Sequence, residues 1–424
     1  MTGPTTYFDP AHVDDLDPAT ADLVRRRIAV LGPAYRLFYR EPVEFVRGSR
    51  AHLFTADGTD YLDAYNNVPS VGHAHPRVVA AIAEQAARLN THTRYLDAAT
   101  VAYAEDLLGT FPAHLSHVMF TCTGSEANDL ALRIAKAATG GTGVIVSGNA
   151  YHGVTTEIAG ISPSLVGLEN LAPWARAVRA PAPDVDLAAA VRATLGELEV
   201  MNVRPAALIV DTVFASDGVH PDLPGLADAV AAVRAGGGLF IADEVQPGFG
   251  RLGTTMWGFE RLGLEPDLVT LGKPMGNGHP IAAVVARPEL TAAFAARSRY
   301  FNTFGGNPVA IAAAQATLDV LRDERLPENA ARVGERLADG IRSLPHVAEV
   351  RGAGLFLGVD LVGPDGTPDE GFTLDVVDAM KQRRVLLATA GVGNTTLKIR
   401  PPLPFDDADA DRLLQTLGEV LARV

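Results

Sequence analysis

Lysine is scarce in this 424-residue chain, in which nearly all of the 36 basic residues are arginine. The only lysines are Lys136, Lys273, Lys381 and Lys398. A guanidinium group cannot act as a nucleophile, so each retained lysine is a candidate for covalent chemistry as well as for an ordinary ion pair. Cysteine is scarcer still, because the single Cys122 excludes an internal disulfide and suits a reducing compartment.

Long apolar runs and basic clusters are also missing. No apolar run approaches the roughly 18 residues of a membrane-spanning helix, and the acidic N-terminal segment lacks the apolar centre of a signal peptide. The net charge is −14, which argues against nucleic acid as a partner. We therefore expect a cytoplasmic protein with no membrane or nucleic-acid partner, and its 47% hydrophobic residues suffice for a large core.

The most informative stretch is residues 239–279, where two short apolar runs end at charged residues. Residues 239–242 lead into Asp243, and residues 268–271 lead towards Lys273. Such runs predict buried strands, and open α/β sheets bind ligands at the carboxyl ends of their strands. A pyridine cofactor would use both charges, because the lysine forms an imine with its aldehyde and the aspartate keeps the ring nitrogen protonated. On spacing alone, an ordinary ion pair explains the lysine equally well.

Strands and helices alternate from about residue 98 to residue 316, which predicts a mostly parallel sheet with helices on both faces. Residues 43–62 predict a small antiparallel meander, and the last hundred residues mix helices with strands. The predicted division is an N-terminal arm with part of a small domain at 1–70, a large domain at 71–316 and a C-terminal small domain at 317–424. The predicted strands of the large sheet are 117–122, 143–147, 207–211, 239–243, 267–271 and 281–286.

Residues 121–128 follow one of these strands and open a helix, with the hydroxyls of Thr123 and Ser125 on either side of Gly124. Free N–H groups at a helix start, with a glycine that permits close approach, form an anion site. Taken alone, the segment is better explained as a plain helix cap by Ser125. Beside a lysine and an aspartate suited to a pyridine ring, however, a phosphate site completes the requirements of pyridoxal phosphate.

Two loops fit the same cofactor. Tyr151 follows a predicted strand, so its ring can lie on the pyridine face. Thr303 lies in a glycine-rich turn and can cap a phosphate. Each of these features is weak by itself, because an aromatic residue in a loop usually only packs.

His73 and His75 are candidate metal ligands because they lie two residues apart in one loop. No third ligand lies at a useful spacing from them. A turn with capping histidines is therefore favoured, and no metal site is expected.

With these motifs in hand, the chain resembles the class III aminotransferases, which are pyridoxal-phosphate enzymes of fold type I. The likeness covers nearly the whole chain, with motifs in a specific order and spacing. The matching motifs are GHAHP at 72–76, TGSEAN at 123–128, YHG at 151–153, DEVQPGFGR at 243–251, GKPMGNGHP at 272–280, FNTFGGNP at 301–308 and LKIRPP at 397–402.

The resemblance implies a large domain with a mostly parallel seven-stranded sheet and a small α+β domain built from both chain ends. It implies that Lys273 carries the internal aldimine and that Asp243 pairs with the pyridinium nitrogen. It also implies a homodimer with active sites at the interface, where Thr303 completes the phosphate site of the neighbouring subunit. The other cofactor-binding residues that it implies are Gly124 and Ser125 at the phosphate, Tyr151 on the ring face with His152 beside it, and Gln246 at the ring hydroxyl.

The reaction depends on the fate of the carbanion that forms when freed Lys273, as the general base, removes the proton next to the substrate nitrogen. Reprotonation on the cofactor gives amino transfer, whereas a leaving group on the adjacent carbon gives elimination. Aminotransferases of this family that use 2-oxoglutarate generally carry a glutamate after the strand at 207–211 and an arginine shortly before the last PP. Ser216 and Lys398 stand at those positions here, which puts α-carboxylate binding in doubt unless Arg400 serves as the clamp.

The local wording is similar to that of the ethanolamine-phosphate and phosphohydroxylysine phospho-lyases, notably YNNV at 65–68, NTHTRYL at 90–96 and RVLL at 384–387. Those enzymes eliminate phosphate from a 2-aminoethyl phosphate unit and leave an enamine that hydrolyses to an aldehyde and ammonia. The substrate-binding candidates are the cations Arg94, Lys398 and Arg400 with the neutral donors Asn66 and Asn67; for Arg94, an interface or surface ion pair is an equal alternative.

We therefore predict a phospho-lyase that acts on a small primary amine resembling O-phosphoethanolamine. The main alternative is a class III (ω) aminotransferase that moves an amino group from a primary amine or amino acid to a 2-oxo acid. Other carbanion or elimination chemistry in secondary metabolism is a third alternative.

Overall fold

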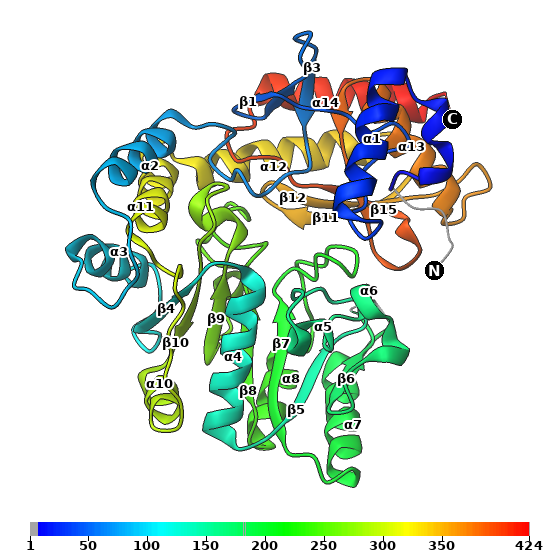
Figure 1. Cartoon of the computed structure of the whole chain (residues 1–424). Helices are drawn as coiled ribbons and strands as arrows, with labels where there is room; N and C mark the ends of the chain where they lie inside the picture. Colours follow the sequence, from blue (N-terminus) through cyan, green and yellow to red (C-terminus); the bar gives the residue numbers. More distant parts are fainter. Residues whose placement is uncertain (1–6, 181, 183, 424) are drawn as a thin grey trace.

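The computed structural model describes residues 7–180, 182 and 184–423. Its large sheet has seven strands in the order β4-β10-β9-β8-β7-β5-β6 (Figure 1). Within it β10 runs antiparallel to both neighbours and the other strands run parallel, which confirms the predicted mostly parallel α/β fold. The strands are β4 (His117–Thr121), β5 (Gly143–Ser147), β6 (Ala175–Val178), β7 (Pro205–Asp211), β8 (Leu239–Asp243), β9 (Leu268–Leu271) and β10 (Ala282–Ala286).

Helices cover both faces of this sheet, because successive strand residues point to opposite sides. Ile241 of β8 packs in the core beneath α4 (Gly124–Thr139) and α10 (Pro288–Ala295). Its neighbours Phe240 and Ala242 pack in the core that contains α7 (Leu187–Val200), α8 (Leu226–Ala235) and α11 (Pro308–Asp323). The ends of the strands are therefore the part of the sheet that a ligand can reach.

The two ends of the chain meet in the second half of the molecule, drawn at the top of Figure 1. The C-terminal strand β13 (Val385–Leu386) pairs in parallel with β3 (Asp60–Asp63) of the N-terminal meander, as the resemblance implied. The boundaries predicted at residues 70 and 316 stay predictions. The other strands here are β1 (Arg47–Ser49) and β2 (His52–Phe54) of the first four-stranded sheet, and β11 (Val347–Ala353), β12 (Phe356–Leu361), β14 (Ala388–Ala390) and β15 (Thr396–Ile399) of the second.

Most predicted elements are present with ends shifted by a few residues, but edge strand β6 was missed. Its sequence, ARAV, places Arg176 within the strand and gives no apolar run to recognise. In the described part of the chain, no helix combines the length and apolar character needed to cross a membrane. The remaining helices are η1 (Pro10–Asp15), α1 (Pro18–Leu31), α2 (Pro76–Arg88), α3 (Ala98–Leu108), α5 (Thr156–Ala159), α6 (Pro163–Val166), η2 (Leu168–Asn170), α9 (Gly258–Arg261), η3 (Lys273–Gly276), α12 (Leu326–Arg342), α13 (Glu370–Gln382), η4 (Val392–Asn394) and α14 (Asp407–Leu421).

His52 ties the N-terminal meander to the last helix. Its Nδ1 lies 2.8 Å from an oxygen of Asp60 on β3, and its Nε2 lies 2.9 Å from an oxygen of Asp409 on α14. Arg412 of α14 makes a 2.7 Å ion pair with Asp60. The hydrogen bond with Asp409 raises the pKa of His52, with burial opposing this rise and Asp60 adding to it.

We expect this junction to make stability depend on pH. Because the folded-state pKa of His52 is raised, its contribution is full below the unfolded value of about 6.5 and is lost as pH rises through the folded value. His52→Gln should therefore lower the melting temperature more at about pH 5.5 than at about pH 8.5. The corresponding loss in the free energy of unfolding should be less than about 1 kcal/mol, because the ring is partly exposed. His12→Gln, which removes an exposed partner of Asp15, is the control. An equal loss at both pH values would contradict this role.

Candidate active site

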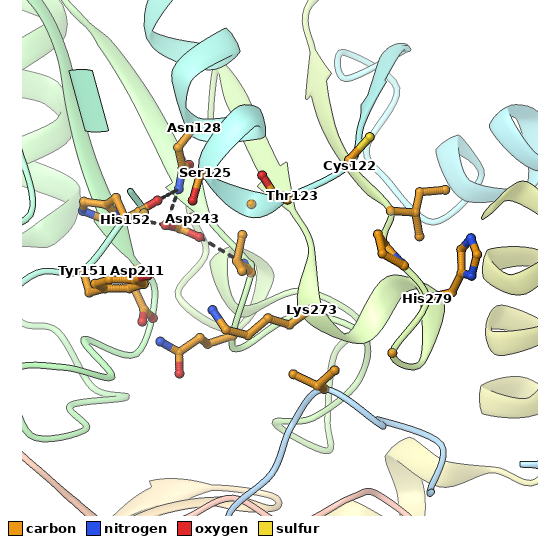
Figure 2. A pocket seen from close by; sticks show the side chains of 18 residues that line it. Cys122, Thr123, Ser125, Asn128, Tyr151, His152, Asp211, Asp243, Lys273 and His279 are labelled. Carbon is orange, nitrogen blue, oxygen red and sulfur yellow. Dashed lines mark hydrogen bonds and ion pairs between the residues drawn. The ribbon is translucent and has the colours of Figure 1, made fainter. Parts of the chain in front are cut away.

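The carboxyl ends of β7, β8 and β9 border a cavity of about 300 Å³ (Figure 2). Its wall also includes the start of α4, the loop after β5 and the turn that follows Lys273. The volume lies at the lower end of the roughly 300–1,000 Å³ range of small-molecule sites. Asp243 and Lys273 therefore lie where the sequence predicted them, at the carboxyl edge of the sheet, and this edge borders the cavity.

Asp243 makes three hydrogen bonds in this cavity, although only 4% of the residue is exposed. His152 Nδ1 lies 2.7 Å and Asn128 Nδ2 3.0 Å from Oδ2, and the Val245 N–H donates to Oδ1 at 3.1 Å (Figure 2). Burial opposes ionisation, but the contact with His152 and the other hydrogen bonds hold the pKa of Asp243 below its usual value. Asp243 is therefore a buried carboxylate that stays charged.

Asn128 links this carboxylate to two other segments, and sequence reasoning gave it no role. Its amide also donates to the backbone oxygen of His152 at 2.8 Å, and its Oδ1 accepts from the Thr270 hydroxyl at 2.7 Å. The only sequence feature that could have pointed to Asn128 as a site residue is its place in the TGSEAN motif. Its function depends on side chains from α4, β8 and β9 that only the fold brings together.

The four lysines divide into two kinds. Lys136 pairs with Glu157, and Lys381 pairs with Glu41 at 2.9 Å. Lys273 and Lys398 have no hydrogen bond or ion pair with any described residue. The Lys273 amine lies 5.9 Å from the centroid of the Tyr151 ring, and burial and the nearby Arg400 lower its pKa. An ordinary ion pair, the alternative open at the sequence level, does not account for Lys273.

The start of α4 is capped by Thr123, not by Ser125 as the plain-cap interpretation had it. The Thr123 hydroxyl accepts from the Glu126 N–H at 3.1 Å, and the Glu126 carboxylate accepts from the Cys122 and Thr123 N–H groups. The N–H groups of Gly124 and Ser125 have no acceptor among the described residues. These two donors face the cavity wall and can hold an anion.

Glycines let three backbone segments converge on this cradle. A Cβ at Gly153, which has φ +135°, would lie 2.4 Å from the Ser125 hydroxyl oxygen. A Cβ at Gly272, next to Lys273, would lie 3.3 Å from the Gly124 Cα. The lysine, the helix start and the loop after β5 can therefore approach one ligand closely.

Asp211 is a second acid in the cavity that sequence reasoning did not select. It ends β7 and is the direct strand partner of Asp243. Its oxygens accept from the Val213 and Ala215 N–H groups, while burial and the nearby Asp243 raise its pKa to about 6. The predicted strand ended at this residue, but nothing in the sequence distinguished it from an acid in a surface turn.

Gln246 joins the cavity to the second half of the molecule. Its side-chain oxygen accepts from Arg400, whose guanidinium lies 5.0 Å from the centroid of the Tyr65 ring. Lys398 lies two residues earlier on β15, and only 7% of it is exposed. The charge of Arg400 lowers the pKa of Lys273, and the charge of Lys398 opposes the rise in the pKa of Asp211.

Thr303 and the five residues predicted to bind substrate, which include Lys398 and Arg400, lie outside the wall of the cavity. Arg94 and Thr303 are exposed, and the Arg94 guanidinium stacks 3.8 Å from the centroid of the Phe301 ring. Asn66 accepts from the Val68 N–H at 3.1 Å, whereas the buried Asn67 amide nitrogen has no partner within the described ranges. Roles for these residues at a substrate stay predictions.

The two histidines of the 72–76 motif are both paired with acids. His73 lies 2.7 Å from Asp63, and His75 lies 3.0 Å from Glu324. His75 occupies the N-cap position of α2, but its side chain makes no capping hydrogen bond. The predicted turn is present, but its histidine side chains hydrogen-bond to acids.

A mostly parallel sheet with a free lysine, a buried charged aspartate and an anion cradle at its carboxyl edge is the arrangement of an α/β enzyme. The sequence profile of the family "Aminotransferase class-III" matches residues 39–421. The chain belongs to the class III aminotransferase family.

Relatives within this family differ in their reactions. The chain is 38% identical to an alanine–glyoxylate aminotransferase 2-like protein of Drosophila melanogaster, across 95% of this chain and 87% of that protein. It is 36% identical to the ethanolamine-phosphate phospho-lyase homolog 1 of Caenorhabditis elegans, across 94% and 93%. A phospholyase from Arthrobacter, solved in complex with phosphoethanolamine, superposes with a TM-score of 0.91 at 43% identity, across 95% of this chain and all of that one.

Removal of Asn128 tests whether its network holds the site together. Asn128→Ala leaves the Asp243 carboxylate and the His152 carbonyl short of a donor, so we expect a loss of about 1–3 kcal/mol in stability. The melting temperature of the cofactor-free protein should fall accordingly. Asn170→Ala, at an exposed asparagine that bonds the Val166 carbonyl, is the control. Equal melting temperatures for the two variants would show that the network is dispensable.

Proposed function

We propose that this enzyme is a pyridoxal-phosphate-dependent phospho-lyase that acts on a small phosphorylated primary amine such as O-phosphoethanolamine. The observation that carries the proposal is the likeness, over 95% of the chain, to the Arthrobacter phospholyase solved with phosphoethanolamine. The products would be an aldehyde, ammonia and phosphate.

The residues of the cavity fit pyridoxal phosphate. The unsatisfied N–H groups of Gly124 and Ser125 suit its phosphate, and the charged Asp243 suits a protonated ring nitrogen. When bound, the group supplies an electron sink that makes the proton next to the substrate nitrogen acidic. Lys273 would hold its aldehyde carbon, and the other proposed contacts are Tyr151 on the ring face, His152 behind Asp243 and Gln246 at the ring hydroxyl.

Lys273 is the proposed general base. Burial lowers its pKa, so more of the amine is neutral near pH 7 than in an ordinary lysine. No carboxylate pairs with it among the described residues, so the nitrogen lone pair is available to accept a proton from carbon. Asp243 has the complementary task, because a fixed negative charge is needed wherever the ring nitrogen keeps its proton.

Lys398 and Arg400 are the proposed cations for the substrate phosphate. Lys398 lies on β15 and Arg400 just after it, in the second half of the molecule, whereas the cradle and Lys273 belong to the first. Ser216 has no charge with which to neutralise them. The buried Asn67 amide, which has no partner in the part of the chain that the structure describes, is the proposed neutral donor, with Asn66 beside it.

Arg94 and Thr303 are proposed to act across a homodimer interface, where Thr303 would complete the phosphate site of the neighbouring subunit. Around them, His92 stacks on Tyr95 with ring centroids 5.0 Å apart and contacts the edge of Phe301. A contiguous exposed apolar patch marks an interaction surface, and a second copy of this chain would cover it. The exposed apolar side chains of the patch are Tyr95, Leu96, Phe301 and Phe304. We further propose a cytoplasmic location, which suits the single free Cys122.

The second candidate function is amino transfer to a 2-oxo acid. It is favoured by the 38% identity to the alanine–glyoxylate aminotransferase 2-like protein. Lys398 in place of a bidentate arginine argues against it, because a point charge orients a carboxylate less well.

The two candidates differ in their products. We expect wild-type protein reconstituted with pyridoxal phosphate to release phosphate and ammonia in equal amounts from O-phosphoethanolamine, without accumulating the pyridoxamine form. Lys273→Ala should abolish both the release and the absorption band of the lysine-bound cofactor. A stable shift to the pyridoxamine form that a 2-oxo acid reverses would establish the aminotransferase instead.

Gly153→Ala tests the phosphate cradle through cofactor affinity. The added Cβ would collide with the Ser125 hydroxyl, so we expect the Kd for pyridoxal phosphate to rise at least about tenfold, the worth of one charge-assisted hydrogen bond. Fluorescence titration of the cofactor-free protein measures it. The matched control is Gly237→Ala, where φ is +85° and nothing lies within 4 Å of the added Cβ. Unchanged affinity in Gly153→Ala would place the phosphate elsewhere.

A further inference from the structure

Lys398 has an unusual place in the second half of the molecule. It sits on β15 between Gly358 of β12 and Ala388 of β14, so its two cross-strand neighbours on the same face are small. Its chain neighbours Leu397 and Ile399 point to the other side, into the apolar core. The long amine side chain therefore lies on the opposite face of the sheet, between two small cross-strand neighbours, and is almost fully buried there.

That face lies against the loop that follows β7. A Cβ at Gly358 would lie 2.8 Å from the Gly218 carbonyl oxygen, and the Gly391 N–H donates to the Ser216 carbonyl at 3.1 Å. The loop begins at Asp211, which lines the cavity. Lys398 thus points from the sheet that contains β15 towards the carboxyl edge of the seven-stranded sheet, where the cavity lies.

The charged groups that act on the Lys398 amine come from three segments. They are Arg400, just after β15, Asp211 and Asp217 at the two ends of the loop segment, and Lys273 after β9. Asp217 is already bound to the Ser147 hydroxyl at 2.6 Å and the Asn149 N–H at 2.8 Å, and Asp211 to two backbone N–H groups. Lys398 itself has no hydrogen-bond acceptor among the described residues, so the acceptor it lacks is one that a ligand can supply.

We propose that Lys398 is a catalytic acid, which binds the substrate phosphate and donates a proton to its bridging oxygen as the carbon–oxygen bond breaks. The inference rests on the proposed phospho-lyase function and deepens it. Burial and the nearby Arg400 lower the pKa of this amine to about 7, which suits a proton donor that works near neutral pH. Arginine at this position could bind the phosphate but could not give up a proton.

The step balances in atoms and charge. The bond between carbon and the bridging oxygen breaks, and its electron pair stays on that oxygen, which takes the Lys398 proton and leaves as hydrogen phosphate. Lys273 takes the proton next to nitrogen, and the electron pair that this proton leaves behind forms the carbon–carbon double bond. Water then hydrolyses the enamine to aldehyde and ammonia, and the neutral Lys398 regains a proton from solvent.

Two substrates with different leaving groups distinguish the binding of the substrate by Lys398 from the donation of a proton by Lys398. Sulfate is a much weaker base than phosphate and needs no proton to depart, so 2-aminoethyl sulfate is the matched substrate for O-phosphoethanolamine. In Lys398→Arg, we expect phosphate release to slow by about 100-fold or more, the usual worth of a general acid, and sulfate release to change by less than about threefold. The Kd for O-phosphoethanolamine, from the spectral change of the bound cofactor, should also stay within about threefold because the charge is kept.

Two further variants complete the experiment. Lys381→Arg changes the other buried lysine, which pairs with Glu41 away from the cavity, and should leave both reactions unchanged. Lys398→Gln, which lacks the charge, should weaken O-phosphoethanolamine binding as well as slow phosphate release, and it covers the case in which the arginine does not fit.

Each result has a distinct meaning. Equal slowing of phosphate and sulfate release in Lys398→Arg, or no slowing of either, would overturn the acid role while leaving the phospho-lyase intact. Release of neither anion by the wild-type enzyme would instead overturn the proposed function, and this role with it.

Discussion

The charge on Asp243 is the constraint on which the rest of the structure depends. A carboxylate at the end of a central strand is costly to bury, and it stays ionised only if several donors surround it. His152, Asn128 and the Val245 N–H provide them, and Thr270 in turn fixes Asn128. These groups come from α4, the loops after β5 and β8, and strand β9. Asp243 is therefore kept ionised only when the large sheet has assembled correctly.

The remaining charges are divided between the two halves of the molecule. The half that holds the seven-stranded sheet carries Asp211, Asp243, Lys273 and the anion cradle, whereas Lys398 on β15 and Arg400 just after it belong to the other half. Arg400 reaches across to Gln246, and the loop after β7 packs against Gly358. A substrate that carries both an amine and a phosphate matches this division, because its two ends would meet different halves.

Much of this arrangement could be predicted from the sequence. The apolar runs before Asp243 and Lys273 gave two adjacent strands and their edge, and the ordered motifs gave the family. Strand β6 escaped because its arginine hides the apolar pattern. Asn128 and Asp211 escaped for a different reason: their importance lies in side-chain contacts between segments far apart in the chain, and no local pattern encodes such contacts.

The most direct test of the account is the protonation state of the cofactor ring in the assembled enzyme. The ¹⁵N chemical shift of ring-labelled pyridoxal phosphate can be followed against pH in wild-type protein and in Asp243→Asn. We predict that the ring nitrogen stays protonated across the neutral range in the wild type and loses its proton in the variant. A ring nitrogen that titrates identically in both proteins would contradict the account, because the buried charge of Asp243 would then not be what keeps the ring nitrogen protonated.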